Sequence, residues 1–86
     1  MKKILIEDDE EMEYLSMALK PMKRKAQKIL TITKCRHEGA EYIKIRYVDF
    51  DGLIDEWYFP SYRGGYRKTY KGMELDRDYT PEELGL

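Results

Sequence analysis

Apolar residues near the start of the chain recur at intervals of three and four positions, which is the period of a helix with one apolar face. This segment begins in the acidic run of residues 7–11 and ends among basic residues, so both ends complement the helix dipole. We expect Pro21 to kink or split the helix, because proline removes a backbone donor. The apolar stripe, which we interpret as core packing, consists of Met12, Leu15, Leu19 and Met22.

From residue 28 apolar and polar positions alternate, which is typical of strands. A four-residue loop at 37–40 is expected after the first strand. Asp51-Gly52 predicts a two-residue turn before the third, because both central positions of a type I′ turn need positive φ. Thr80 and Glu83 form a capping-box pattern, so a short helical turn is expected near the end. The expected strands span 28–36, 41–50 and 53–59, with a weaker fourth at 66–70.

These elements predict one small α+β domain, residues 1–86. An N-terminal amphipathic helix, kinked or split at Pro21, packs on one face of a three- to four-stranded antiparallel β-meander. With the Asp51-Gly52 turn, Arg46 lies opposite Trp57. The face expected to receive the helix carries Leu30, Ile32, Ile43, Ile45, Tyr47, Ile54 and Tyr58. The other face carries Thr31, Thr33, Tyr42, Lys44, Arg46, Asp55, Trp57 and Phe59.

That second face combines polar side chains with large aromatic ones. Trp, Tyr and Arg are enriched at interface hot spots, and Arg46 is placed to stack on Trp57. The alternative is that Trp57 and Phe59 pack beneath the 60–71 loop or the C-terminal tail. Both interpretations stay open at this point.

The net charge of −1 hides strong segregation along the chain. Residues 20–36 contain seven Lys and Arg and no acid, whereas residues 1–13 contain six acids and two Lys. Residues 38–59 and 72–86 are acidic, and residues 60–71 are basic. Alternating blocks of this kind favour orientation-specific contacts over general attraction to a polyanion.

The chain lacks the residue patterns that enzymes and metal sites need. Cys35 and His37 are the only residues of their types and supply two of the four ligands of a structural zinc. The acidic segment at 49–56 fails the calcium-loop spacing, because Gly52 is at its fourth position and not its sixth. We therefore expect no catalytic residues, no metal and no cofactor. A single cysteine and the lack of long apolar runs favour a cytoplasmic protein without membrane contact.

The leading hypothesis is a small regulatory or inhibitory protein that binds a protein partner, with a homodimer left open. One version has the acidic start imitating a phosphate backbone in the basic groove of a nucleic-acid enzyme. Small phage-borne inhibitors such as anti-CRISPR proteins, which this chain resembles in size and charge style only, act in this way. The expected partner-binding residues are Arg46, Trp57, Phe59, Tyr42, Lys44, Glu7, Asp8, Asp9, Glu10 and Glu11.

The alternative is a small nucleic-acid-binding module that uses the basic segment 20–36 and the Tyr/Arg-rich segment 62–71. Aromatic residues interleaved with cations suit base stacking and phosphate contact. A sequence pI of about 5.9 weighs against it, since autonomous nucleic-acid-binding domains are usually basic. The residues expected to contact nucleic acid are Lys23, Arg24, Lys25, Tyr62, Arg63, Tyr66, Arg67, Lys68, Tyr70 and Lys71.

Overall fold

The acidic run near the N-terminus starts the first helix. Asp8 caps it, because its carboxylate accepts hydrogen bonds from the backbone N–H groups of Glu10 (2.8 Å) and Glu11 (3.3 Å). The computed structural model describes residue 6 and residues 8–63, 66–67 and 70–86, with the backbone alone at 62–63 and 66–67. Two helices, α1 (Asp9–Leu19) and α2 (Met22–Lys25), follow one another as a bent segment. The part that Pro21 plays in this bend stays a prediction.

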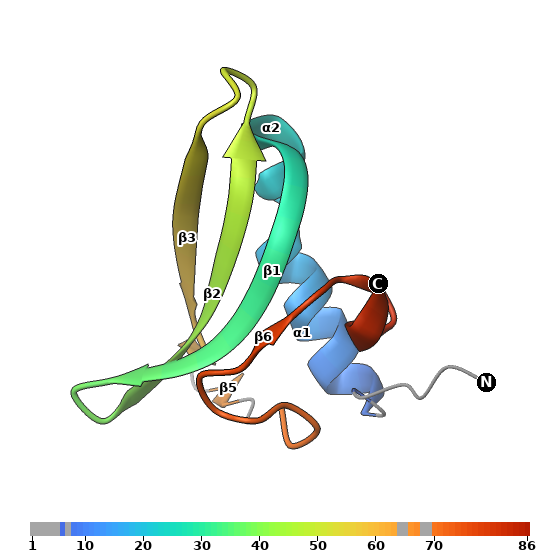
Figure 1. Ribbon diagram of the computed structural model, residues 1–86. Coiled ribbons are helices and arrows are strands. Elements are labelled where there is room, and N and C mark those ends of the chain that lie inside the picture. Colours follow the sequence, from blue (N-terminus) through green and yellow to red (C-terminus); the bar gives the residue numbers. More distant parts are fainter. Residues whose placement is uncertain (1–5, 7, 64–65, 68–69) are drawn as a thin grey trace.

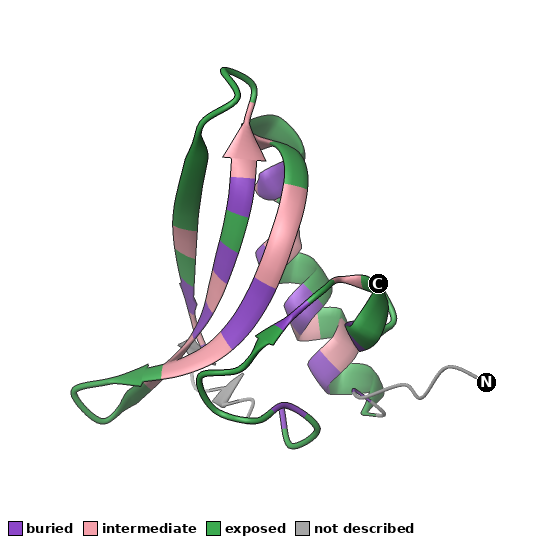
Figure 2. Cartoon of the chain, in the orientation of Figure 1, coloured by how far each residue is buried: buried purple, intermediate pink, exposed green. Residues whose placement is uncertain are grey.

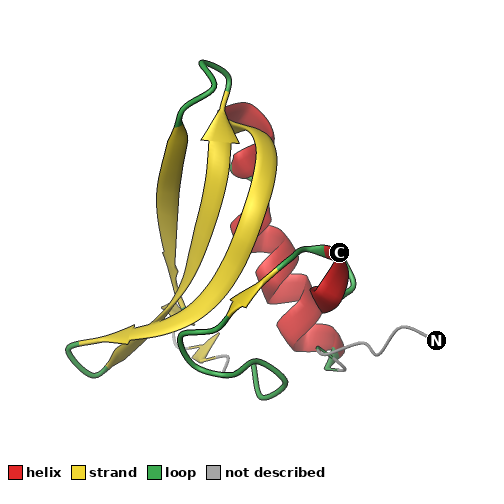
Figure 3. Cartoon of the chain, in the orientation of Figure 1, coloured by secondary structure: helices red, strands yellow, loops and turns green. Residues whose placement is uncertain are grey.

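Three long strands form an antiparallel meander, and a short fourth strand pairs with its far edge. The strands are β1 (Ala26–His37), β2 (Ala40–Asp49), β3 (Ile54–Pro60) and β6 (Asp78–Tyr79), in the order β3-β2-β1-β6. The helices lie against one face of this sheet (Figures 1 and 3). The expected α+β fold, with a helix on an antiparallel sheet, is confirmed.

The fourth strand of the main sheet does not come from the segment expected to supply it. Within 66–70 the structure has β5 (Tyr66–Arg67), which pairs with β4 (Tyr62–Arg63) in a separate two-stranded sheet. The edge of β1 is instead taken by β6, where Tyr79 pairs with Ile32. A two-residue strand such as β6 leaves almost no alternation in the sequence to detect.

The β2–β3 connection is a three-residue loop, so the expected two-residue turn at Asp51-Gly52 is wrong. The backbone N–H of Gly52 donates to the Asp49 carbonyl (3.1 Å), and that of Asp49 donates to the Leu53 carbonyl (2.8 Å). Of the loop residues Phe50, Asp51 and Gly52, only Gly52 has positive φ. This is a type I turn followed by a glycine bulge.

The Asp49 side chain explains why this loop forms. Its Oδ1 accepts hydrogen bonds from the backbone N–H groups of Asp51 and Leu53, each at 2.9 Å. Asp at the first position of a type I turn and Gly at the fourth are the residues that this turn favours. The extra loop residue shifts the pairing of β3 by one, so Ile45 and not Arg46 lies opposite Trp57.

The β1–β2 connection is tighter than the four-residue loop expected at 37–40. His37 pairs with Ala40, and both central residues have positive φ, at 51° for Glu38 and 81° for Gly39. The type I′ turn therefore lies here. The expected pairing of Ile32 with Ile45 is confirmed, whereas bulges in β1 place Ile29, and not Leu30, opposite Tyr47.

The core lies between the helices and the sheet, and the C-terminal tail closes it (Figure 2). The apolar stripe of the helix is buried as expected at Leu15 and Met22, while Met12 and Leu19 pack against the core partly buried. The tail adds side chains that the sequence did not mark as core. The buried hydrophobic residues are Ile6, Leu15, Ala18, Met22, Ile32, Ile43, Ile45, Tyr47, Phe59, Tyr70, Met73, Tyr79 and Leu84.

The predicted capping box forms near the end of the chain. Thr80 N–H donates to Glu83 Oε1 (3.1 Å), and Glu83 N–H donates to Thr80 Oγ1 (3.3 Å). The short 3-10 helix η1 (Glu82–Leu84) follows and buries Leu84 in the core. The tail is thereby fixed against the helix side of the sheet.

Candidate functional site

The sheet face turned away from the helices is the candidate site, and we call it the open face. Strand alternation and the observed register assign its members. Tyr58 and Ile54 on β3 are 54% and 58% exposed, so no described element covers them. The open face comprises Thr31, Thr33, Cys35, His37, Tyr42, Lys44, Arg46, Ile54, Glu56, Tyr58 and Asp78.

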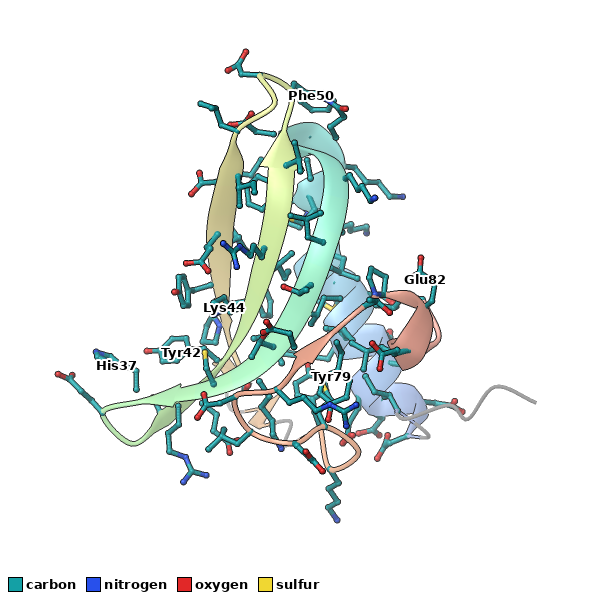
Figure 4. All side chains as sticks on the ribbon, viewed as in Figure 1. His37, Tyr42, Lys44, Phe50, Tyr79 and Glu82 are labelled. Atoms are coloured by element: carbon teal, nitrogen blue, oxygen red, sulfur yellow. The ribbon has the colours of Figure 1, made fainter. Side chains whose placement is uncertain are left out.

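A shallow cleft of about 490 Å³ lies on the open face, near the β1–β2 turn. Figure 4 shows Tyr42, Lys44 and His37 projecting to the same side of the sheet, away from the helices. Lys44 lies directly opposite Tyr58, and Tyr42 is two residues away along β2. Tyr42 and Tyr58 are therefore the aromatic neighbours of Lys44 on this face. The cleft is lined by Cys35, Arg36, His37, Tyr42, Lys44 and Tyr58.

Polar contacts join several side chains of the open face. Lys44 Nζ lies 3.7 Å from Glu56 Oε2, and the Tyr58 hydroxyl donates to Glu56 Oε1 (3.4 Å). Thr33 Oγ1 donates to Asp78 Oδ1. Cations and carboxylates alternate across the strands, so the face offers matched polar contacts between aromatic rings and no uniformly positive field.

The thiol of Cys35 lies at the cleft and is held in its protonated form. Burial raises its pKa, Lys44 opposes this, and Asp76 and Glu56 add to the increase. The Sγ atom lies 3.6 Å from the Tyr42 carbonyl oxygen, to which the thiol donates. A thiol with a raised pKa has little thiolate at neutral pH, so this group is a weak nucleophile.

The expected placement of Trp57 and Phe59 on the open face is wrong, because the one-residue shift in register moves every side chain of β3 to the opposite face. Phe59 is buried, with its ring 5.5 Å from that of Tyr14 in an edge-to-face contact. Trp57 is partly buried against the core, and the cation over its ring is Lys25, at 4.2 Å, and not Arg46.

The same shift changes the other residues of β3. Asp55, expected on the open face, lies on the helix side, where its Oδ2 accepts from the Tyr47 hydroxyl (3.4 Å). Ile54 and Tyr58, expected in the core, are exposed. Arg46 is exposed on the open face and pairs in register with Glu56. Tyr42, Lys44 and Arg46 thus stay together, and Tyr58 and Glu56 join them.

The described acids of the N-terminal segment differ in their surroundings. Asp8 is used as the helix cap, and Glu11 is buried. Asp9 and Glu10 are exposed, and Glu7 lies outside the described residues. Asp8, Asp9 and Glu10 are thus the described acids of this segment that a partner can reach.

The expected nucleic-acid contacts are divided between two regions. Lys23, Arg24 and Lys25 are exposed and line a groove of about 590 Å³ together with Lys20 and Pro21. In the second region, Tyr70 is fully buried and so cannot stack on a base, while Lys71 is exposed. Lys68 and the side chains of Tyr62, Arg63, Tyr66 and Arg67 lie outside what the structure describes.

Sequence reasoning missed Tyr58, Glu56 and Cys35 as members of the site. The signal that places the first two is the Asp49-x-x-Gly52 spacing, which favours the type I turn and thus fixes the register of β3. Cys35 follows from its pairing with Tyr42 in the β1–β2 hairpin. The loss of Trp57 and Phe59 from the site and the gain of Tyr58 have the same cause.

The chain matches no protein-family model, no curated protein and no solved structure. Among the described residues, no three His, Cys, Asp or Glu side chains gather where they could hold a metal ion. Nor does any described helix combine the length and apolar character needed to cross a membrane. The open face itself is therefore the basis for a functional hypothesis.

Proposed function

We propose that this chain is a non-enzymatic regulatory or inhibitory protein that binds a protein partner through the open face of its sheet. The observation that carries this proposal is the exposure of Tyr58 and Arg46 beside the half-buried Tyr42 and Lys44, on a sheet face that is turned away from the helices. Tyrosine and arginine are among the residue types that contribute most to binding energy at protein interfaces. A regular sheet presents them with little loss of backbone entropy on binding.

The electrostatics of the open face support a protein partner over a polyanion. A nucleic acid is bound mainly through cations that neutralise its phosphates. On the open face Lys44 is paired with Glu56, and Arg46 faces the same carboxylate across the strands. A partner that offers both donors and acceptors fits this pattern better than a uniform row of phosphates.

The raised pKa of Cys35 supports a binding role over a catalytic one. The cleft contains a thiol, an exposed imidazole and an ammonium group. Burial holds the thiol protonated, and the thiol donates its hydrogen bond to the Tyr42 carbonyl oxygen and not to a base. Activation of a cysteine nucleophile requires an adjacent base or a lowered pKa.

The experiment is affinity capture from lysate with matched variants of the tagged chain. The double variant Arg46→Ala, Tyr58→Ala should lose a protein that the wild type retains, because it truncates the two outward side chains at the centre of the face. The control is Met17→Ala, since Met17 on α1 is 53% exposed and Tyr58 is 54% exposed. Retention of the same protein by the double variant would overturn the proposal.

A salt titration of the captured complex separates the two classes of partner. Binding to phosphates weakens steeply with the logarithm of salt concentration. Docking through Tyr58 and Tyr42 should weaken only slightly between 50 mM and 200 mM salt, conditions over which a contact to several phosphates loses about a thousandfold or more in affinity. A steep loss together with nuclease sensitivity would favour the nucleic-acid-binding alternative.

A further inference from the structure

The β2–β3 turn presents an exposed apolar group on a rigid loop. Phe50, Leu53 and Ile54 are 63%, 65% and 58% exposed. The Asp49 carboxylate accepts hydrogen bonds from the backbone N–H groups of Asp51 and Leu53, so the backbone that carries these side chains is restrained before any contact forms. Large apolar side chains that are exposed at neighbouring positions, here beside the acidic Asp51, mark a candidate interaction surface. We call Phe50, Asp51, Leu53 and Ile54 the hairpin tip.

A basic groove lies at the same end of the molecule. It has a volume of about 590 Å³ and lies where α1 is followed by α2. Within the described part of the chain, no carboxylate forms an ion pair with its cations. The methylene groups of long cationic side chains supply apolar surface below their charged ends. The groove is lined by Lys20, Pro21, Lys23, Arg24 and Lys25.

The hairpin tip and the basic groove are neighbours on one copy. Ala26 follows α2 directly and pairs with Asp49, the residue that begins the turn. Lys25 lies over the ring of Trp57 on β3. Figure 1 shows α2 beside the upper end of β2, close to the turn. An apolar projection that carries the acidic Asp51 thus lies next to a basic concavity at the same end of the molecule.

We propose that two copies of this chain associate through this end, with the hairpin tip of each copy seated in the basic groove of the other. A twofold axis between the copies makes both contacts at once, because in such an interface each surface meets its complement on the partner. Each copy supplies both a hairpin tip with a negative charge and a groove with positive charges. A second copy is therefore the occupant that the observed surfaces fit.

Pairing of β3 edges is a less suitable route to a dimer. The outer edge of β3 is the longer of the two open edges of the main sheet, because the strand at the other edge, β6, has two residues. Asp55 Oδ1 accepts the backbone N–H of Glu56 at 2.8 Å, which occupies a donor on this strand. A charged side chain that engages the backbone in this way discourages a strand of another chain from adding to the sheet.

The available surface sets the expected strength of the dimer. The chain exposes 6144 Å² in total. An interface that takes about a tenth of the surface of each copy buries roughly 1,200 Å² over both, which is the lower limit for a stable complex. We expect a dissociation constant in the micromolar range and a dimer that weakens as salt screens its charges.

Charge reversal tests the proposal directly by sedimentation velocity over a concentration series. The groove variant is Lys23→Glu with Arg24→Glu, and the tip variant is Asp51→Lys. Each alone should remain monomeric where the wild type dimerises, because both contacts of its homodimer lose their attraction. An equimolar mixture should recover a dimer, since each copy then meets its opposite charge. This recovery also shows that both variants are folded.

The matched control is Lys71→Glu with Arg77→Glu, which has the same net charge as the groove variant but changes exposed positions in the C-terminal tail. It should dimerise like the wild type. A wild type that stays monomeric at millimolar concentration, or a mixture of the two reversed variants that stays monomeric, would overturn the proposal. So would a groove that binds a single-stranded oligonucleotide while the chain remains a monomer. Ile54 belongs to both surfaces, but the reversed residues Lys23, Arg24 and Asp51 lie outside the open face, so capture of a different protein is measured separately with Arg46→Ala, Tyr58→Ala.

Discussion

Two buried tyrosines of the C-terminal tail should respond to loss of their hydroxyl groups with opposite sign. Tyr70 and Tyr79 are 0% and 1% exposed. The Tyr70 hydroxyl has no hydrogen-bond partner among the described residues. The Tyr79 hydroxyl oxygen accepts the backbone N–H of Glu74 at 2.7 Å. Substitution by phenylalanine removes the same atom from each site but a hydrogen bond from only one.

The magnitudes follow from what each deletion leaves behind. A buried polar group without a partner costs about 1–3 kcal/mol, so we expect Tyr70→Phe to raise the free energy of unfolding by about 1 kcal/mol. Tyr79→Phe leaves the N–H of Glu74 without its acceptor, and we expect a loss of about 1 kcal/mol. In a chain of this size each change corresponds to a shift of roughly 4–8 °C in Tm.

Urea denaturation followed by circular dichroism measures both changes, provided that the slope of unfolding free energy on urea is unchanged. A second readout is the stability at alkaline pH. Burial, with smaller effects of Tyr14 and Glu11, raises the pKa of Tyr70 above its usual 10. Above pH 10 the folded state therefore keeps a proton on Tyr70 that the unfolded state releases. The stability that depends on protonated Tyr70 is fully present below pH 10 and is lost as the pH rises above 10.

Tyr70→Phe should therefore show a shallower loss of stability above pH 10 than the wild type. The reasoning fails if Tyr70→Phe destabilises the chain as much as Tyr79→Phe does. That result would mean that the hydroxyl of Tyr70 has a hydrogen-bond partner in the folded protein.

The remaining predictions concern the turn, the core and the thiol. Asp49→Ala should lower the free energy of unfolding by about 1–2 kcal/mol, because two backbone N–H groups lose their acceptor, whereas Asp51→Ala in the same loop should change it by less than about 0.5 kcal/mol. Leu15→Ala should cost about 2–5 kcal/mol in urea denaturation, since Leu15 is fully buried, and Met17→Ala serves as its exposed control on α1. Alkylation of Cys35 should reach half its maximal rate at a higher pH than that of an unstructured cysteine peptide, and an equal or lower midpoint would contradict the raised pKa.

Local patterns predicted the elements of this fold well where one segment carried its own signal. Leu15 and Met22 were correctly predicted to be buried, because the spacing of apolar residues on one helix face is set by the helix itself and not by what packs against it. The capping box at Thr80 and Glu83 formed because it needs only residues three positions apart. The pairing of Ile32 with Ile45 was predicted correctly although the loop was not. The expected four-residue loop and the observed two-residue turn, in which His37 pairs with Ala40, give β1 and β2 the same register.

Which side chains form the candidate site depends on whether the β2–β3 loop has two residues or three. Asp51-Gly52 suits a type I′ turn, but the Asp49 side chain stabilises a type I turn that is one residue longer. Because side chains alternate along a strand, that one residue exchanged Trp57 and Phe59 for Tyr58 and Glu56 on the open face. The core contribution of Tyr70 was not predictable from alternation, since it lies in an irregular tail at positive φ.

Photo-crosslinking from two equally exposed positions tests the central claim most directly. A benzophenone side chain replaces Tyr58 on the open face in one variant and Met17 on α1 in the other, positions that are 54% and 53% exposed. In lysate containing the partner, the position 58 variant should form one dominant crosslinked product with a protein other than this chain, and the position 17 variant should not. Equal crosslinking from both positions, or a product from position 17 alone, would contradict binding through the open face.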